Sequence, residues 1–213
     1  MTALADLRRE YASRALTEQD ADADPIRQFH AWFDEVLKSQ LTDANAMTLA
    51  TASPNGEPAA RIVLLKGADE SGFVFYTNYD SAKGRDLAAN SRACLLFFWP
   101  ELERQVRITG SVAKTTTAES DSYFHSRPVE SQISAAISRQ SRAISDRSEL
   151  ESRYAAALEK YKGSIVPLPS NWGGYRVTPD TIEFWQGRKS RLHDRLVYTK
   201  QVDGTWSRAR LEP

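Results

Sequence analysis

The chain combines stretches with the period of an amphipathic helix and short stretches with the period of a strand. Asp24 followed by Pro25 is a helix-start signal, a capping carboxylate and then proline at the first helical position. Apolar side chains then recur at helical spacing through about Ser39. The acidic, alanine-rich stretch before Pro25 is typical of a linker. The pattern therefore predicts a mobile N-terminal arm over residues 1–24 and one folded domain over residues 25–213.

Strand patterns fill most of the remaining chain. An Asn-Gly pair at 55–56 and an Asp-Gly pair at 203–204 are hairpin signals between apolar runs. A short polar helix is expected over 81–90, and residues 116–162 have a helical pattern that Pro128 interrupts. The predicted strands are residues 46–52, 60–66, 73–77, 93–99, 105–114, 174–177, 182–185, 192–200 and 206–211.

Strands that follow one another as hairpins predict an antiparallel sheet. These short strands, some of them continuously apolar, favour a small closed or partly closed barrel with helices packed outside it. The alternating strand and helix units of a nicotinamide-binding domain are missing from the pattern. We therefore predict a mainly β fold with peripheral helices.

Composition narrows the class of partner. The chain has 213 residues with 28 basic and 28 acidic side chains, so its formal net charge is zero. This balance argues against binding to a nucleic-acid backbone, which needs a basic surface. Hydrophobic residues make up 41%, enough for a globular core. The composition favours a small-molecule ligand.

The sequence shows no motif for a membrane span, a signal peptide or a metal site. The apolar runs are far shorter than the ~20 residues that cross a bilayer, and the N-terminus has no signal-peptide pattern, so we expect a cytoplasmic protein without membrane contact. Cys94 is the single cysteine, and its apolar run predicts an inert thiol in a buried strand. The three histidines have no metal-ligand spacing, so we expect no metal site.

Two polar clusters lie at strand ends in the first half of the chain. Arg61 and Lys66 bracket an apolar strand, and their odd separation puts them on opposite faces. They are either exposed strand ends or, if they share a ligand, they need a strand end, a bulge or a second chain. Between Tyr76 and Lys83, hydroxyl groups precede a helix start. That arrangement suits either a phosphate cradle or an ordinary helix cap at Asp80 or Ser81.

Two more clusters lie in the second half. Tyr123, Arg127 and Ser131 are spaced by four residues and suit an anionic group, although a solvated helix face looks similar. On a strand, Arg191, His193 and Arg195 would share one face and would repel one another unless an anion lay among them. Trp185 adds a flat apolar wall, so this last cluster favours a planar, phosphorylated aromatic ligand.

Taken in order, these clusters resemble the pyridoxine/pyridoxamine 5′-phosphate oxidase family of flavoproteins. The similarity runs almost from end to end, and its most specific segment is Arg-Leu-His-Asp-Arg at 191–195. The other similar segments are residues 7–11, 61–66, 75–78, 102–106, 123–128, 138–141, 169–174 and 183–190.

The resemblance implies an antiparallel, FMN-binding split β-barrel that works as a homodimer with FMN at the subunit interface. It also implies oxidation of pyridoxamine 5′-phosphate and pyridoxine 5′-phosphate to pyridoxal 5′-phosphate, with O₂ as acceptor and H₂O₂ released. The FMN-binding residues would be Arg61, Ile62, Val63, Leu64, Leu65, Lys66, Tyr76, Thr77, Ser81, Lys83, Gln105, Gln140, Ser141, Trp185 and Arg195.

By the same resemblance, Arg191 and His193 would be the catalytic residues facing the pyridine ring. The substrate-binding residues would be Arg8, Arg9, Glu10 and Tyr11 of the N-terminal arm, together with Lys66, Tyr123, Arg127, Ser131, Arg191, Leu192 and His193.

One position departs from the family pattern. The family usually has arginine against the FMN phosphate where this chain has Ala82. Three alternatives to the oxidase are a related split-barrel flavin- or deazaflavin-dependent reductase, a non-catalytic FMN- or pyridoxal-phosphate-binding protein and, least favoured by the zero net charge, a nucleic-acid-binding barrel.

Overall fold

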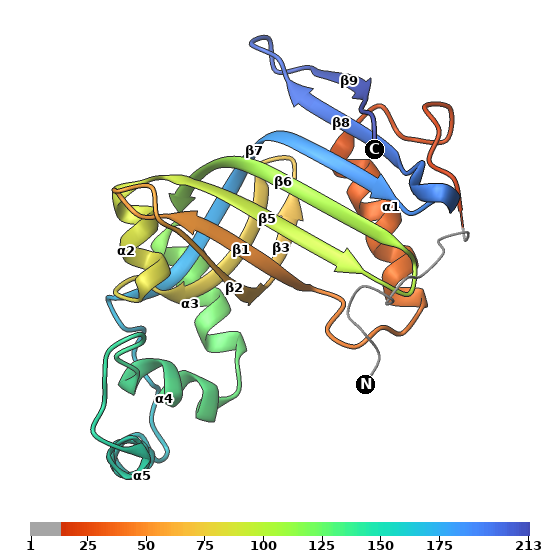
Figure 1. The fold of residues 1–213 in the computed structure, drawn as a ribbon. Helices are drawn as coiled ribbons and strands as arrows, with labels where there is room; N and C mark the ends of the chain where they lie inside the picture. Colours follow the sequence, from red (N-terminus) through yellow and green to blue (C-terminus); the bar gives the residue numbers. More distant parts are fainter. Residues whose placement is uncertain (1–13) are drawn as a thin grey trace, which may run out of the picture.

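A single nine-stranded sheet forms the centre of the protein (Figure 1). The computed structural model describes residues 14–213. All strand pairs are antiparallel, in the order β2-β1-β5-β6-β7-β4-β3, with β8 paired to β7 and β9 to β8. The strands are β1 (Ala46–Ala52), β2 (Pro58–Leu64), β3 (Gly67–Asp69), β4 (Gly72–Asn78), β5 (Arg92–Trp99), β6 (Arg104–Lys114), β7 (Trp172–Gln186), β8 (Asp194–Lys200) and β9 (Trp206–Arg210).

The sheet curls so that its two ends approach each other. Strand β3 follows β2 in the chain after two residues, although the two stand at opposite ends of the strand order. The Lys66 amide, just beyond β2, donates a hydrogen bond to the Val74 carbonyl of β4 at 2.8 Å. The result is a half-barrel, and the prediction of a mainly β, antiparallel, partly closed barrel is confirmed.

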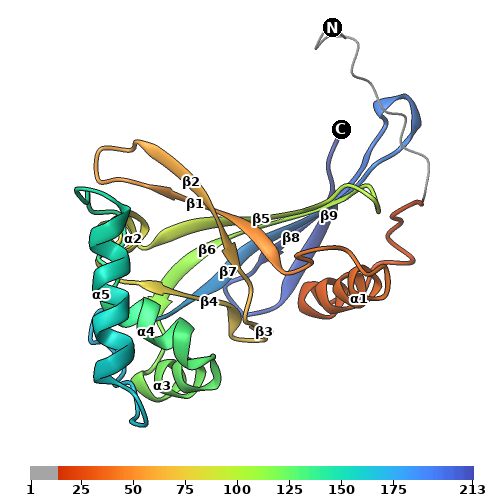
Figure 2. The ribbon, with the colours of Figure 1, turned by 90° about the horizontal axis from the view of Figure 1, so that it is seen from below.

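The helices gather at the two ends of this half-barrel. Helix α1 lies at one end, whereas α2 to α5 lie together at the other, as both views show (Figures 1 and 2). Asp24 caps α1 by accepting a hydrogen bond from the Ile26 amide, as its position before Pro25 predicted. The helices are α1 (Pro25–Lys38), α2 (Ala82–Ala89), α3 (Thr117–Ser126), α4 (Val129–Ile137) and α5 (Arg147–Lys160).

The sheet and the helices pack around two hydrophobic cores. In the larger core α1 packs against the inner face of the sheet, where the fully buried Phe29 contacts Phe73 and Phe97 with ring centroids 4.9 and 5.3 Å apart. The smaller core lies under α3 to α5 and includes Phe124 and Trp172. The helical end is therefore a packed extension of the half-barrel with a core of its own.

Strand β7 differs most from the sequence-based expectation. Two strands, 174–177 and 182–185, were predicted, because Pro179 and its neighbours have the composition of a turn. The structure has one continuous strand of 15 residues. The pairing with β6 shifts between Thr109 and Gly110, which leaves Asp180 of β7 without a register partner next to the proline, and a β-carbon at Gly110 would lie only 2.0 Å from the Thr178 carbonyl oxygen. The bulge explains both the proline and the glycine.

The described part of the predicted arm is bound to the C-terminal strands. Leu16 is 3% exposed, and its amide donates to Asp194 at 3.0 Å. The Tyr198 hydroxyl donates to the Asp22 carbonyl at 2.6 Å, and Arg208 donates to the Ala21 carbonyl at 2.8 Å. Leu16, Ala21 and Asp22 thus attach this segment to β8 and β9.

Candidate functional site

A cavity of about 560 Å³ opens at the helical end of the half-barrel, between β2, β4 and helices α3 and α4. Eleven residues predicted as FMN- or substrate-binding line it: Arg61, Ile62, Val63, Leu64, Lys66, Tyr76, Thr77, Lys83, Tyr123, Arg127 and Gln140. Five lining residues were not predicted, namely Asn78, Ser134, Ala135, Ser138 and Trp172. Ser134 and Ser138 follow Ser131 at helical spacing, and this spacing is the signal by which the sequence could have identified them.

Arg61 and Lys66 both reach this cavity because the strand ends between them. Strand β2 stops at Leu64, so Lys66 no longer follows the alternation of the strand. A strand end, a bulge or a second chain could bring the two cations to one ligand, and the structure has the strand end. Arg61 is held by the Thr51 hydroxyl at 2.7 Å and by Asp86 at 3.7 Å.

The cavity is strongly cationic. Lys83 donates to the Thr77 hydroxyl at 3.3 Å and to the Gln140 side-chain oxygen at 3.1 Å. Burial, followed by the nearby charge of Arg61, lowers the pKa of Lys83. Within the described part of the chain, the four cations Arg61, Lys66, Lys83 and Arg127 have one carboxylate partner, Asp86. Their excess positive charge favours an anionic ligand.

Arg127 is held in the cavity wall by an aromatic ring and a backbone carbonyl group. It lies over the Trp172 ring at 4.9 Å, and its Nη2 donates to the Ser131 carbonyl at 3.0 Å. Its Nη1 is buried with no hydrogen-bond partner among the described residues, and burial lowers the pKa of the guanidinium. A buried donor without an acceptor costs about 1–3 kcal/mol, and an acceptor oxygen from a ligand in the cavity would satisfy this atom.

An aromatic wall stands beside Arg127. Tyr76 and Tyr123 are stacked with centroids 3.9 Å apart, and Trp172 continues the stack at 5.6 Å from Tyr76. Lys66 lies 5.9 Å from the centre of the Tyr123 ring. The wall and the cations together offer a flat apolar surface next to an anion site.

Four predicted residues near the cavity do not line it. Leu65 is buried in the larger core. Ser81 is fully buried, and its hydroxyl caps α2 by accepting from the Gly84 amide at 3.2 Å, the helix-cap alternative that its sequence left open. Ser141 follows Gln140 with a left-handed backbone, φ 68°. Ser131 contributes its carbonyl to Arg127 rather than a hydroxyl to the cavity.

A second group of predicted residues forms a row on the outer face of the sheet. Gln105 of β6 pairs in register with Trp185 of β7, which pairs with Arg195 of β8. Phe98 of β5 extends the row and is 52% exposed. We call these four residues the outer row. Arg195 donates to Glu183 at 2.8 Å, and Glu183 is 3% exposed.

The prediction that Arg191, His193 and Arg195 share one face of a strand is wrong. Strand β8 begins at Asp194, and Arg191 ends a short 3₁₀ helix, η2 (Lys189–Arg191). Arg191 itself has φ 61°, which turns the chain out of the extended conformation. Leu192 is 69% exposed beside it. A turn therefore separates Arg191 from the strand that carries Arg195.

His193 is held in one protonation state. The Arg188 amide donates to its Nδ1 at 3.1 Å, and an amide can only donate, so Nδ1 carries no proton. Burial and the charge of Arg191 lower the pKa of His193. Its ring lies 4.6 Å from that of Trp185. His193 is thus a neutral imidazole whose Nε2–H can donate a hydrogen bond.

The outer row and the cavity lie apart within one chain. Trp185 stands four strand spacings from Leu64 in the strand order, roughly 19 Å at ~4.8 Å per strand. Neither the outer row nor η2 lines the cavity. Cys94 lies on the same outer face of β5 and is half-buried, because the core side of that strand is taken by Leu95; the expectation of a core thiol is wrong.

Two more statements hold for residues 14–213. No group of three or more potential metal-ligating side chains occurs in that part of the chain. None of its helices is both long enough and apolar enough to cross a membrane. The predicted substrate residues Arg8, Arg9, Glu10 and Tyr11 lie outside the described residues.

Known proteins match the whole chain. The family model "Pyridoxamine 5′-phosphate oxidase" matches residues 33–161, and "Pyridoxine 5′-phosphate oxidase C-terminal dimerisation region" matches residues 172–213. Proteins named pyridoxine/pyridoxamine 5′-phosphate oxidase from Ralstonia pickettii and Burkholderia multivorans are 55% and 58% identical to it, each over 100% of both chains.

Solved structures share the fold. The crystal structure of PhzG from Burkholderia lata, in complex with tetrahydrophenazine-1-carboxylic acid, has a TM-score of 0.89 and 29% identity over 95% of this chain and 100% of that chain. A pyridoxamine 5′-phosphate oxidase-related, FMN-binding protein from Nostoc punctiforme has a TM-score of 0.72 at 18% identity, covering 89% and 98%. The second likeness concerns the fold alone.

Proposed function

The chain belongs to the pyridoxine/pyridoxamine 5′-phosphate oxidase family, and from this premise we propose that it makes pyridoxal 5′-phosphate with FMN as cofactor. Pyridoxamine 5′-phosphate, O₂ and water would give pyridoxal 5′-phosphate, ammonia and H₂O₂. Pyridoxine 5′-phosphate and O₂ would give pyridoxal 5′-phosphate and H₂O₂. The names of the full-length relatives support an oxidase of this class.

The observation that carries the proposal is that Nη1 of the cavity-lining Arg127 is buried with no hydrogen-bond partner among residues 14–213. Lys66 and Tyr123 stand beside it on the cavity wall. A phosphate monoester satisfies this site, because it brings two negative charges and several acceptor oxygens. Binding at the phosphate positions the reacting carbon without touching it, which turns remote binding energy into orientation.

The remaining cavity groups fit the phosphate and ring of FMN. Arg61 and Lys83 supply a second pair of cations, and Thr77 and Gln140 supply polar groups next to them. The buried polar network leaves the positive charge of this pair only partly compensated by Asp86. Bound FMN supplies hydride acceptance and electron transfer to O₂. Predicted contacts from the outer row are Gln105, Trp185 and Arg195.

A homodimer completes the proposed site. The exposed outer face carries Ile62, Leu64 and Phe98, which are 64%, 42% and 52% exposed. Exposed apolar patches of this kind mark interaction surfaces. Trp185, Arg195 and η2 lie within residues 172–213, the region similar to a dimerisation region. Gln105 and Phe98, the other two residues of the outer row, lie outside it. We assign the outer row of one protomer to the cavity of its partner, with FMN between them.

In this arrangement Arg191 and His193 orient the pyridine ring of the substrate. His193 offers an Nε2–H donor because the Arg188 amide occupies its Nδ1. Arg191, exposed on η2, has no carboxylate partner in the described part of the chain and brings a free positive charge. Both groups position the substrate and favour negative charge that develops nearby.

The test is an absorbance spectrum of the purified protein in air, before and after addition of pyridoxamine 5′-phosphate. A flavin band, followed by formation of pyridoxal 5′-phosphate and H₂O₂ in equal amounts, supports the oxidase. A flavin band without turnover, even with other acceptors, indicates a binding protein. Turnover only with a different acceptor indicates a split-barrel reductase. Absence of any flavin after incubation with FMN would contradict the cofactor assignment.

A further inference from the structure

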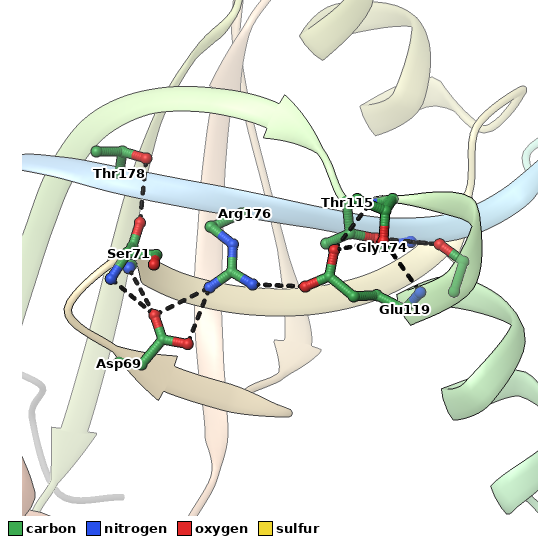
Figure 3. Close-up of polar contacts among 10 residues, drawn as sticks. Asp69, Ser71, Thr115, Glu119, Gly174, Arg176 and Thr178 are labelled. Atoms are coloured by element: carbon green, nitrogen blue, oxygen red, sulfur yellow. Dashed lines mark hydrogen bonds and ion pairs between the residues drawn. The ribbon is translucent and has the colours of Figure 1, made fainter.

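Arg176 of β7 joins two elements that come from distant parts of the chain (Figure 3). Its Nη1 donates to both carboxylate oxygens of Asp69, at 3.0 and 3.2 Å, and its Nη2 donates to Glu119 at 2.8 Å. The arginine side chain is 22% exposed. Asp69 ends β3 and Glu119 lies in the first turn of α3, so one guanidinium connects three elements.

Each carboxylate is also anchored within its own element. Asp69 accepts from the Ser71 amide at 2.7 Å and thereby closes the β3–β4 turn. Glu119 accepts from the amide and the hydroxyl of Thr116, both at 2.8 Å, in the capping box that starts α3. These Thr116 bonds, followed by Arg176, lower the pKa of Glu119, so it is ionised. The three-way contact is therefore built from rigid parts.

The two elements that Arg176 joins carry the opposing sides of the phosphate end of the cavity. Strand β3 begins immediately after Lys66. Tyr123 lies four residues after Glu119 on α3, and Arg127 follows four residues later. A change in the angle between the β3–β4 turn and α3 would move Lys66 relative to Tyr123, which are now 5.9 Å apart from ammonium to ring centre.

We propose that Arg176 is a positioning residue for phosphate recognition, acting through Lys66 on one side and through Tyr123 and Arg127 on the other. This inference rests on the proposed function, because it assigns Arg176 to the phosphate site of that function. Arg176 holds the two sides at the spacing that a phosphate group needs. It touches neither the cavity nor the reacting atoms.

Arg176 also compensates charge. Glu119 lines a shallow hollow with Tyr76 and Tyr123, directly behind the aromatic wall. Without the guanidinium, Asp69 and Glu119 become two uncompensated negative charges near the phosphate site and repel a dianionic ligand. Both effects weaken binding of the phosphate and leave the reacting centre intact. Loss of Arg176 should therefore raise KM and leave kcat nearly unchanged.

The experiment compares Arg176→Met with Arg92→Met in the FMN-loaded full chain. Arg92 pairs with Asp180 on the same sheet, but both side chains are about half exposed and lie away from the cavity. We expect Arg176→Met to raise KM for pyridoxamine 5′-phosphate, and the Kd for pyridoxal 5′-phosphate, about tenfold. FMN content and kcat should stay within about twofold, and Arg92→Met should change neither constant.

Two further variants keep the test decisive if Arg176→Met is unstable. Arg176→Lys retains the charge and should recover part of the affinity, and Glu119→Gln added to Arg176→Met should recover part by removing repulsion. An unchanged KM and Kd would overturn the proposal. So would equal losses of FMN, kcat and thermal stability without a change in KM, since those indicate a structural role alone.

The binding measurement also separates this inference from the proposed function. If the wild-type protein binds pyridoxal 5′-phosphate but does not oxidise the amine, the proposed oxidase fails, and the Kd ratio between the two variants still decides the role of Arg176. If the wild-type oxidises the amine and the ratio is near one, the oxidase stands and the role of Arg176 is refuted.

Discussion

The two ends of the proposed site are built on different principles. The cavity end is enclosed by β2, β4, α3 and α4 of one chain and stands on its own hydrophobic core. The outer row and η2 lie on an open sheet face beside exposed apolar side chains. The first end is enclosed within one chain, whereas in the proposed homodimer the second would obtain its surroundings from the partner.

Their electrostatics differ in the same sense. At the outer end Arg195 pairs with Glu183 at 2.8 Å, and Arg210 pairs with Asp194 at 2.8 Å. In the cavity, Lys83 and Arg127 have no carboxylate partner among the described residues. The proposed phosphate sites therefore lie at the cavity end. At the outer end Arg195 and Arg210 are compensated, whereas Arg191 has no carboxylate partner among the described residues.

The largest expected effect comes from separating the two ends genetically. One chain carries Lys66→Ala and Arg127→Met, and the other carries Arg191→Ala and His193→Ala. Each homodimer should be nearly inactive. Hybrid dimers, purified through two different tags, should have about half the wild-type activity, because a two-fold dimer then contains one intact site of its two. The measurement is the initial rate of pyridoxal 5′-phosphate formation by the hybrid.

A hybrid of two cavity variants, Lys66→Ala with Arg127→Met on differently tagged chains, is the matched control. It should stay near the level of its homodimers, since neither chain then supplies an intact cavity. If the cross-end hybrid is as inactive as this control, both ends of the site come from one chain and the assignment of the outer row to the partner is wrong.

A smaller loss is expected from Arg127→Met alone. Removing a charge-assisted contact worth about 1.5–3 kcal/mol should lower kcat/KM for pyridoxamine 5′-phosphate by about 10- to 100-fold. FMN content should not change. Arg153→Met is the control, because Arg153 is also partly buried at the helical end, donating to the Ile137 carbonyl at 3.3 Å, but does not line the cavity. Similar losses in both variants would indicate damaged packing instead.

The cavity end was the more predictable of the two from sequence. Local signals decide its parts: Pro128 separates α3 from α4, and the strand at 46–52, whose Thr51 holds Arg61, has the predicted bounds. Tyr123 and Arg127 share a helical face because they are four residues apart. These features depend on neighbours in the chain, so a single sequence contains them.

The outer end depends on long-range structure that a single sequence does not display. The left-handed backbone of Ser190 and Arg191 has no glycine to announce it. Pro179 indicates a turn, but the bulge opposite Gly110 keeps β7 continuous. The row of Gln105, Trp185 and Arg195 exists only through strand pairing across about 90 residues. The resemblance to a family named these residues; periodicity placed each of them on a strand and did not show that the three strands are neighbours.

Ala82→Arg tests the proposed FMN phosphate site at the cavity end. Ala82 is exposed at the first position of α2, next to Lys83. An arginine there would add a third cation near the proposed FMN phosphate, at a helix N-terminus that already favours anions. We expect FMN to bind up to about tenfold more tightly, measured by fluorescence titration of the apoprotein. Ala89→Arg, at the other end of α2, should leave the affinity unchanged, and an equal gain there would reduce the effect to net charge.

The smallest expected effect concerns His125, whose hydrogen bonds stabilise the cavity end. Its Nδ1 faces the Asp121 carbonyl at 3.1 Å and its Nε2 faces the Val166 carbonyl at 3.0 Å. Carbonyl oxygens only accept, so both bonds require the imidazolium. The Val166 contact, followed by those of Asp121, raises the pKa of His125 above 6.5. Its contribution to stability is therefore complete below 6.5 and is lost as pH rises through the raised value.

The corresponding measurement is the difference in melting temperature between the wild type and His125→Gln from about pH 6 to about pH 9. The difference should shrink toward the alkaline end, while His30→Gln, an exposed histidine of α1, should show no such trend. Because Val166 belongs to the smaller core, loosening it at high pH also weakens the support of Arg127. A KM that rises over the same pH interval in the wild type, and not in His125→Gln, would show that the enclosed end owes part of its preorganisation to this one proton; a constant difference in melting temperature would show that it does not.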